Sequence, residues 1–142
     1  MRGGSISTVL RVAFVMSFMG SWYCCMGDKG TASFYFAHFG PTACYGNDTS
    51  QIPEDNNVAR ASDAIWDNGA ACGRQYNVTC TGTMDGTIQG STPITCKNVS
   101  VVVKIVDNCS AGCRGTIDLA QNAFEEIAVP AAGEVYIDYE QV

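Results

Sequence analysis

The chain has 142 residues and a mass of 15.1 kDa, which is the size of a single domain. Eight Lys and Arg residues against fourteen Asp and Glu residues give a net charge of −6. Such an acidic chain offers no electrostatic surface for nucleic acid or an anionic membrane. Its one histidine, His38, excludes sites that need two or more imidazoles, and with them most zinc enzymes. We therefore expect no cofactor and no metal.

The N-terminus has the pattern of an export signal. Arg2 and Arg11 supply positive charge, and the apolar run over residues 12–26 is too short to cross a bilayer core of about 30 Å comfortably. Cleavage after Gly27 predicts a signal peptide over residues 1–27 and a secreted domain over residues 28–142. A retained membrane anchor is the alternative. Four N-glycosylation sequons also fit export, and they begin at Asn47, Asn77, Asn98 and Asn108.

The mature domain keeps six of the eight cysteines, namely Cys44, Cys72, Cys80, Cys96, Cys109 and Cys113. An even number of cysteines in a small exported domain predicts three disulfides. The sequence alone does not choose among the possible pairings. Metal binding is the competing interpretation, because Cys109 and Cys113 have the spacing of half a zinc site. The matching second half is absent from the sequence.

The mature chain contains mostly short strand patterns. In chain order we expect a strand over 31–36, turns and polar loop over 40–57, a short helix over 62–68 that Gly69 ends, a strand over 74–80, a Gly- and Thr-rich loop over 81–91, a strand over 99–107, a helix over 117–127 and a strand over 134–139. Several short strands with one or two short helices predict an all-β domain built as a small barrel.

Five segments resemble one known family: GTASFY (30–35), ACYGN (43–47), IWDNGAACGRQY (65–76), VVVKIVDNC (101–109) and GTIDLAQNAF (115–124). They are similar to the plant natriuretic peptide and EG45-like proteins, small relatives of expansins, barwin and family-45 endoglucanases. The resemblance spans nearly the whole mature chain. It implies a six-stranded double-psi β-barrel with a shallow surface groove. By similarity to expansins, it also implies three disulfides: Cys44–Cys72, Cys80–Cys96 and Cys109–Cys113.

The same resemblance implies a binding groove that contains Tyr35, Tyr45, Asp107 and Asp118. Asp118 matches the acid of the family-45 enzymes and is the one candidate catalytic residue. Tyr35 matches the groove tyrosine of expansins, and Asp107 matches an Asp that expansins carry. Glycoside hydrolysis needs two carboxyl groups that flank the scissile bond. The endoglucanases place their base just after the tyrosine, where this chain has Phe36, Ala37, His38 and Phe39. We therefore expect no efficient hydrolase.

Structural roles are the alternative to a function in the groove for these residues. Asp118 could cap the helix expected to begin there, and Asp107 could hold a turn before Cys109. Tyr35, Tyr45, Trp66 and Tyr76 could stack on sugar rings, although Trp66 fits the core better. A lytic transglycosylase with Asp118 as its only acid and base is a further possibility.

The resemblance implies a monomeric, secreted signalling protein that acts in the apoplast on water and ion homeostasis. Its partner would be a cell-surface receptor protein. The small size, without the second domain that expansins carry, favours this function over wall loosening. A module that binds cell-wall polysaccharide is the first alternative. A weak family-45-type endoglucanase is the second.

Overall fold

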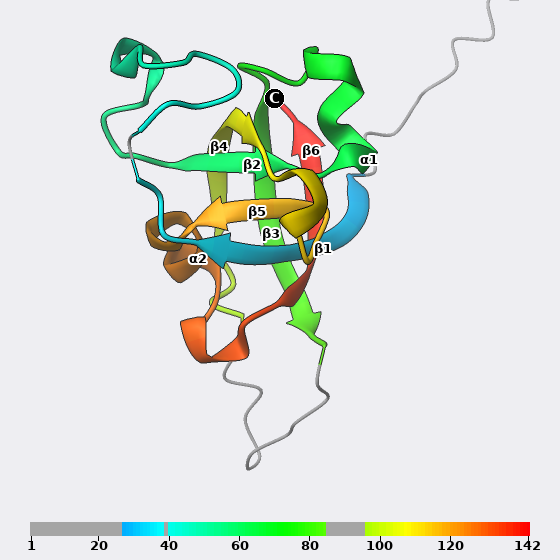
Figure 1. Cartoon of the computed structure of the whole chain (residues 1–142). Coiled ribbons are helices and arrows are strands. Elements are labelled where there is room, and N and C mark those ends of the chain that lie inside the picture. The colour runs from blue at the N-terminus through cyan, green and yellow to red at the C-terminus, as the bar shows by residue number, and fades with distance from the viewer. Residues whose placement is uncertain (1–26, 39, 85–95) are drawn as a thin grey trace, which may run out of the picture.

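The computed structural model describes residues 27–38, 40–84 and 96–142 (Figure 1). Six strands close into a barrel in the order β1-β5-β2-β4-β3-β6. Their bounds are β1 Asp28–Tyr35, β2 Val58–Ala61, β3 Gln75–Thr83, β4 Ser100–Asn108, β5 Ile117–Ala120 and β6 Val135–Gln141. The expected signal peptide up to residue 26, and the expected loop from residue 85 to 91, lie outside the described residues.

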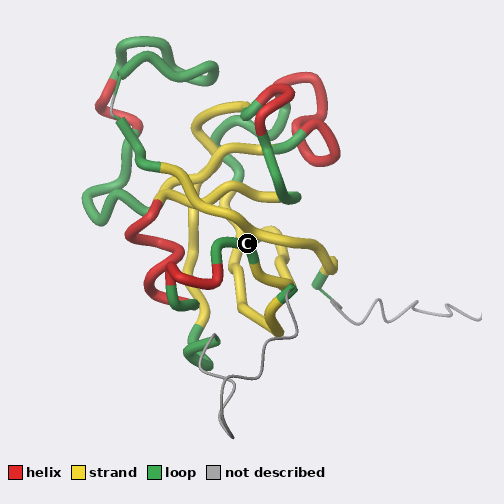
Figure 2. Tube along the Cα trace, turned by 60° about the horizontal axis from the view of Figure 1, so that its bottom comes forward, coloured by secondary structure: helices red, strands yellow, loops and turns green. Residues whose placement is uncertain are grey.

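The barrel mixes parallel and antiparallel neighbours. β1 pairs in parallel with β5, and β2 pairs in parallel with β4, whereas the other four neighbouring pairs are antiparallel. In Figure 1, strands β1, β2 and β5 run across the view, while β3, β4 and β6 run up and down it. The helices lie outside the strands, as Figure 2 shows. The expected all-β barrel with short helices is therefore confirmed.

The barrel interior is filled by alternate residues of the strands. In β4, Val101, Val103 and Ile105 are buried, while Val102 between them is 43% exposed. This alternation follows from strand geometry, in which successive side chains point to opposite faces. Helix α2 (Gln121–Ile127) closes one side with three buried residues, Ala123, Phe124 and Ile127.

The segment 117–127, expected to be one helix, is a strand followed by a helix. Residues 117–120 form β5, which pairs with β1 on one side and β2 on the other, and all four of its residues are buried. Pairing on both sides outweighs the helical spacing of the apolar residues. Helix α2 begins at Gln121, and its N-cap is Ala120 with no side-chain cap. The interpretation of Asp118 as a helix cap is therefore wrong.

The remaining expected elements are close to the observed ones. The expected helix over 62–68 is α1 (Asp63–Trp66), and a 3-10 turn over Asp67–Gly69 follows it. Residues 81–83, expected as loop, extend β3. Strand β2 was not expected at all. None of the helices in the described residues is long and apolar enough to cross a membrane.

Three cysteine pairs lie at disulfide distance, with Cα–Cα separations of 5.4 Å for Cys44–Cys72 and 5.3 Å for both Cys80–Cys96 and Cys109–Cys113. They are the pairs that the resemblance implies. The first joins the loop after β1 to the segment after α1. The third closes a five-residue turn between β4 and β5, so it braces the start of the strand that carries Asp118.

We expect Phe124→Ala to lower the free energy of unfolding by about 3–5 kcal/mol, because the ring is fully buried and its loss leaves a cavity. Urea unfolding of the oxidised protein measures this. The matched control is Val102→Ala on the exposed face of β4, which should change the free energy by no more than about 0.5 kcal/mol. Equal losses in both variants would contradict the assignment of α2 to the core.

Candidate functional site

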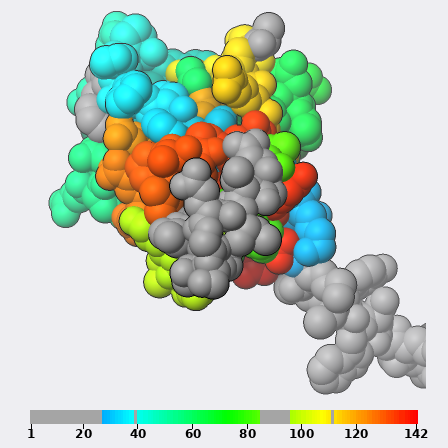
Figure 3. All heavy atoms as spheres, turned by 90° about the horizontal axis from the view of Figure 1, so that it is seen from below, coloured from blue at the N-terminus to red at the C-terminus, as the bar shows by residue number. Residues whose placement is uncertain are grey.

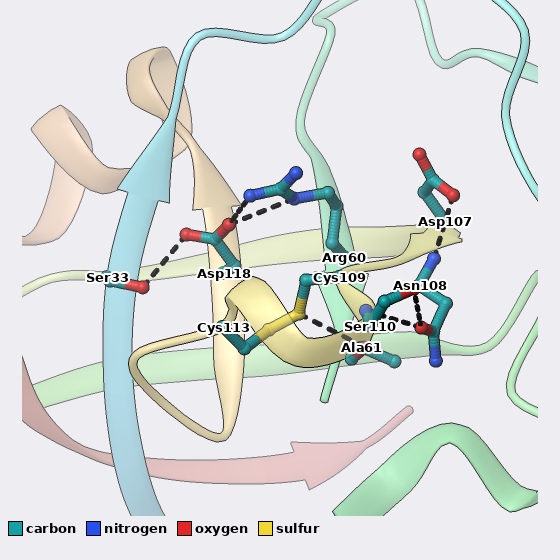
Figure 4. Close-up of a disulfide and its surroundings, with 9 residues drawn as sticks. All are labelled: Ser33, Arg60, Ala61, Asp107, Asn108, Cys109, Ser110, Cys113 and Asp118. Carbon is teal, nitrogen blue, oxygen red and sulfur yellow. Dashed lines mark hydrogen bonds and ion pairs between the residues drawn. A yellow bond between two sulfur atoms is a disulfide. The ribbon is translucent and has the colours of Figure 1, made fainter. Parts of the chain in front are cut away.

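The carboxylate of Asp118 is the centre of a polar cluster on the outer face of the barrel. Asp118 is only 3% exposed. Its Oδ1 accepts a 2.9 Å hydrogen bond from the Ser33 hydroxyl, and its Oδ2 accepts one of 2.9 Å from Arg60 Nε and another from Arg60 Nη2 (Figure 4). The pairing register explains this meeting, because Asp118 lies directly opposite Ser33 of β1 and Arg60 of β2. Cross-strand partners share one face of a sheet.

Tyr35 completes this arrangement, which we call the Asp118 cluster (Ser33, Tyr35, Arg60 and Asp118). The Arg60 guanidinium carbon lies 4.2 Å from the centroid of the Tyr35 ring, a cation–π contact. The ring also packs against a small apolar group that contains Val58, Val106 and Ala120. Burial raises the pKa of Tyr35 to about 12; the charges of Asp107 and Asp118 add to this, and Arg60 opposes it. Tyr35 is thus a neutral phenol at physiological pH.

Asp107 lies at the end of β4 and has a structural role in holding the loop after β1. Its Oδ1 accepts hydrogen bonds from the backbone N–H groups of Ala43 at 2.9 Å and Asn108 at 2.8 Å. It thereby ties the loop after β1 to β4, which agrees with the turn-holding role considered for it. Figure 4 places Arg60 between Asp107 and Asp118. The two carboxylates have different partners, which are backbone N–H groups for Asp107 and the Ser33 and Arg60 side chains for Asp118.

The other aromatic candidates have different contacts from Tyr35. Tyr45 packs against the same apolar group as Tyr35, and Lys104 Nζ lies 5.1 Å from its ring centroid. Tyr76 is 6% exposed and belongs to the main core, and Trp66 packs against that core. Of the four aromatic residues considered for sugar stacking, Tyr35 is the one in the Asp118 cluster, and Trp66 packs against the core as expected.

Arg60 is a member of the Asp118 cluster that the sequence did not predict. It lies in a short run, Val58-Ala59-Arg60-Ala61, whose other three members are fully buried or nearly so. A charged residue inside a buried strand needs a partner of opposite charge. That isolated charge was the available signal, but the run is too short and too rich in alanine to predict a strand.

The four sequons differ in accessibility. Asn47 and Asn98 are exposed, whereas Asn77 lies half-buried within β3. Asn108 is half-buried, and its Oδ1 accepts hydrogen bonds from the backbone N–H and the hydroxyl of Ser110. Glycosylation at these sites stays a prediction.

One group of three potential metal ligands occurs among the described residues. Ligand atoms of Cys109, Cys113 and Asp118 lie within 4.8 Å of one another. The two sulfurs are bonded to each other, and a disulfide offers no thiolate to a metal. In this oxidised form the trio packs the Cys109–Cys113 turn against the Asp118 cluster and is not a metal site.

Comparison with known proteins places the chain in a family. A family model described as "Lytic transglycolase" matches residues 58–139. An EG45-like domain containing protein from Citrus jambhiri is 48% identical over 114 residues, which are 80% of this chain and 81% of that protein. The chain is an EG45-like member of the double-psi β-barrel family. This EG45-like chain is also 38% identical over 133 residues to a putative EG45-like domain containing protein 1 from Arabidopsis thaliana, covering 94% of this chain and 92% of that one.

Expansins share the same barrel. The EG45-like chain is 34% identical over 121 residues to Expansin-A20 of Oryza sativa subsp. japonica, and the match covers 47% of that protein. A point mutant of a Clavibacter michiganensis expansin, solved with cellohexaose, superposes with a TM-score of 0.61 at 24% identity, over 82% of this chain and 50% of that one. The GH45 endoglucanase EG27II with cellobiose has a TM-score of 0.54 at 16% identity, over 82% and 80%. These structures confirm the expected double-psi barrel fold.

The first prediction for the site concerns Tyr35. Because its folded-state pKa of about 12 lies above the ordinary 10.0, the unfolded chain ionises first. The stability that Tyr35 contributes is complete below pH 10 and falls as the pH rises towards 12. Ultraviolet titration should show phenolate that forms above pH 10, and Tyr35→Phe should lower the amplitude of this late step by the share of one tyrosine. The alkaline loss of stability should also be smaller in that variant. Tyr139, whose pKa burial also raises, should still titrate late in Tyr35→Phe and serves as the internal control.

The second prediction concerns the ion pair. Asp118→Asn keeps an acceptor for Ser33 but leaves Arg60 without its counter-charge. We expect a loss of about 2–3 kcal/mol in the free energy of unfolding, at the lower end for a buried pair because the Arg60 side chain is 29% exposed. Arg60→Met, combined with Asp118→Asn, should cost less than the sum of the single variants. Additive losses in denaturant unfolding would contradict the coupling.

Proposed function

We propose that this protein binds a cell-wall polysaccharide through the exposed parts of the Asp118 cluster and does not hydrolyse it efficiently. The burial of Asp118 carries the proposal. A general acid must reach the glycosidic oxygen, yet the Asp118 side chain is 4% exposed and both of its oxygens already accept hydrogen bonds from Ser33 and Arg60. A lytic transglycosylase with Asp118 as its only acid and base would also need this carboxylate to reach the glycosidic oxygen.

The position of a second carboxylate supports the same view. The residues that follow Tyr35 are Phe36, Ala37 and His38, and none of them is acidic. Asp107 is the next candidate, and its Oδ1 is occupied by two backbone N–H groups. Two carboxyl groups on either side of a glycosidic bond are the usual requirement for hydrolysis.

Arg60 and Tyr35 are the groups of the cluster that can meet a ligand. The Arg60 side chain is 29% exposed, and its guanidinium has five N–H donors, of which the one on Nε and one of the two on Nη2 are directed at Asp118. The remaining donors and the Tyr35 hydroxyl suit the hydroxyl groups of a sugar. Ser33 and Asp118 act as positioning residues, because they hold the guanidinium in place.

The proposal extends to the protein's location and organisation. The N-terminal pattern, the six paired cysteines and the sequons support a domain over residues 28–142 that is exported to the apoplast. The complex of a structurally similar expansin with cellohexaose supports a glycan as the ligand.

Extracellular signalling in water and ion homeostasis, which the resemblance to plant natriuretic peptides implies, stays a prediction. It requires a receptor protein in place of a polymer. The two functions therefore differ in one observable property, which is whether insoluble wall polymers remove the protein from solution.

The test is depletion of the purified, oxidised protein by insoluble cellulose, xylan, pectin and chitin. We expect saturable binding to at least one polymer and an affinity about tenfold lower for Arg60→Gln, because a charged donor to the ligand is lost. Arg74→Gln is the matched control, since Arg74 has a similar exposure of 28% and pairs with Asp67 elsewhere on the barrel.

Three outcomes would count against the proposal. Retention of no polymer would favour a protein receptor, and equal binding by Arg60→Gln and the parent would remove the Asp118 cluster from the binding surface. Release of reducing sugar by the parent that Asp118→Asn abolishes would restore the hydrolase hypothesis.

A further inference from the structure

We propose that Phe36 and the polar side chains around it form a second sugar subsite, beside the Asp118 cluster, that takes a pyranose ring of an uncharged glycan. This inference rests on the proposed polysaccharide-binding function and adds a site and a ligand class to it. Phe36 is 67% exposed, the highest exposure among the large apolar side chains of the described residues. Its ring lies on the Phe34 side of the strand end, opposite to Tyr35. Ala37 connects the two places, because it lines the same depression as Phe36 and packs against the same apolar group as Tyr35.

The exposed ring is held in place from behind. Phe36 meets Phe34 edge to face, with centroids 6.3 Å apart and planes at 85°. The ring centroid of Phe34 lies 4.9 Å from that of Phe124, which is fully buried. An aromatic ring that is fixed before the ligand arrives loses little conformational entropy on binding. The Phe36 ring is therefore a preorganised stacking surface for a ligand.

Phe36 forms one wall of a depression of about 420 Å³. Its other lining residues come from the segment after β1, the loop before β2 and helix α2: Ala37, Asp55, Asn56, Gln121, Asn122 and Glu125. On the face seen in Figure 3, cyan atoms of the segment around the end of β1 lie beside orange atoms of α2. This volume lies within the range of small-ligand sites.

Hydrogen bonds hold the polar wall of the depression. The side-chain amide of Asn122 donates to the backbone carbonyls of Asp55 and Asn56, both at 3.2 Å, and so ties the loop before β2 to α2. Gln121 Nε2 donates to Glu125 Oε1 at 2.7 Å. Asn122 also donates to Asn57 Oδ1 at 2.8 Å. Because these amide N–H groups are engaged within the protein, the amide and carboxylate oxygens of the wall are the groups that can accept hydrogen bonds from sugar hydroxyls.

A sugar ring matches this combination of walls. A pyranose has an apolar face of C–H groups, which suits an aromatic ring, and a rim of hydroxyl groups, which suits amides and carboxylates. Within the part of the chain that the structure describes, the lining contains two carboxylates, Asp55 and Glu125, and no Lys or Arg. A polymer of uronic acids would be repelled by this charge, which favours an uncharged glycan over an acidic one.

The expected aromatic candidates are less suited to stacking than Phe36. One face of Tyr35 is occupied by Arg60, and its ring packs on the apolar group beneath it. Tyr45 packs on that same group. We therefore assign hydrogen bonding to the Asp118 cluster and ring stacking to Phe36, and a glycan of several sugars can contact both.

Calorimetric titration of the full oxidised protein tests the subsite. The probes are the disaccharides and hexasaccharides of cellulose, xylan and chitin, with hexagalacturonate as the charged comparison. We expect tighter binding of at least one neutral hexasaccharide than of its disaccharide. Phe36→Ala should weaken that hexasaccharide about three- to tenfold, the value of one aromatic contact, and leave the folded state intact by thermal unfolding. Hexagalacturonate should bind more weakly than the neutral hexasaccharide, and the difference should narrow as salt is added.

The control is Tyr136→Ala, which removes an aromatic ring that is 47% exposed on β6. It should bind the hexasaccharides as the parent does. Phe36→Trp should retain the affinity, and its fluorescence should change when the hexasaccharide binds.

The outcomes separate the two proposals. If the parent binds a neutral hexasaccharide and Phe36→Ala binds it equally well, the subsite is wrong while the proposed function stands. An equal loss in Tyr136→Ala, or tighter binding of hexagalacturonate, also overturns the subsite. If the parent binds no oligosaccharide and no insoluble polymer, the proposed function fails and the subsite fails with it.

Discussion

The carboxylate of Asp118 is buried and must have partners, and the barrel is arranged to supply them. β5 lies between β1 and β2, and its residue 118 stands directly opposite Ser33 and Arg60. A buried carboxylate without a counter-charge costs several kcal/mol. A slip of β5 by one residue would turn Asp118 towards the apolar interior and expose Leu119. The ion pair therefore fixes the register of three strands as well as the position of the Arg60 side chain.

This constraint separates binding from catalysis. The carboxylate that resembles a catalytic acid is engaged in holding Arg60, and Asp107 is engaged in holding the loop after β1. What remains is a guanidinium edge over a neutral phenol and, after the end of β1, the exposed phenyl ring of Phe36. The proposed function assigns hydrogen bonding and stacking to these groups, and the contacts of Asp118 and of Asp107 Oδ1 are the reason that it assigns no cleavage to them.

The sequence predicts the long strands well and the short ones badly. Residues 99–107 are β-branched nearly throughout, which is typical of a strand, and β4 is found there. β2 and β5 have four residues each and contain mostly alanine or uniformly buried residues, so their own preferences are weak and pairing with distant strands decides their structure. Arg60 and the strand position of Asp118 were missed for that reason. The exposure of Phe36 was also unpredictable, because apolar residues beside a strand are normally buried.

The closure of the barrel determines how this protein can be recognised. Each of the six strands that the structure describes is paired on both sides, so these strands leave no open edge to which the backbone of a partner could add as an extra strand. A partner of the barrel must be recognised through side chains and loops. A protein of this kind can be concentrated with little tendency to assemble strand to strand, and its surface residues can change without disturbing the barrel beneath them.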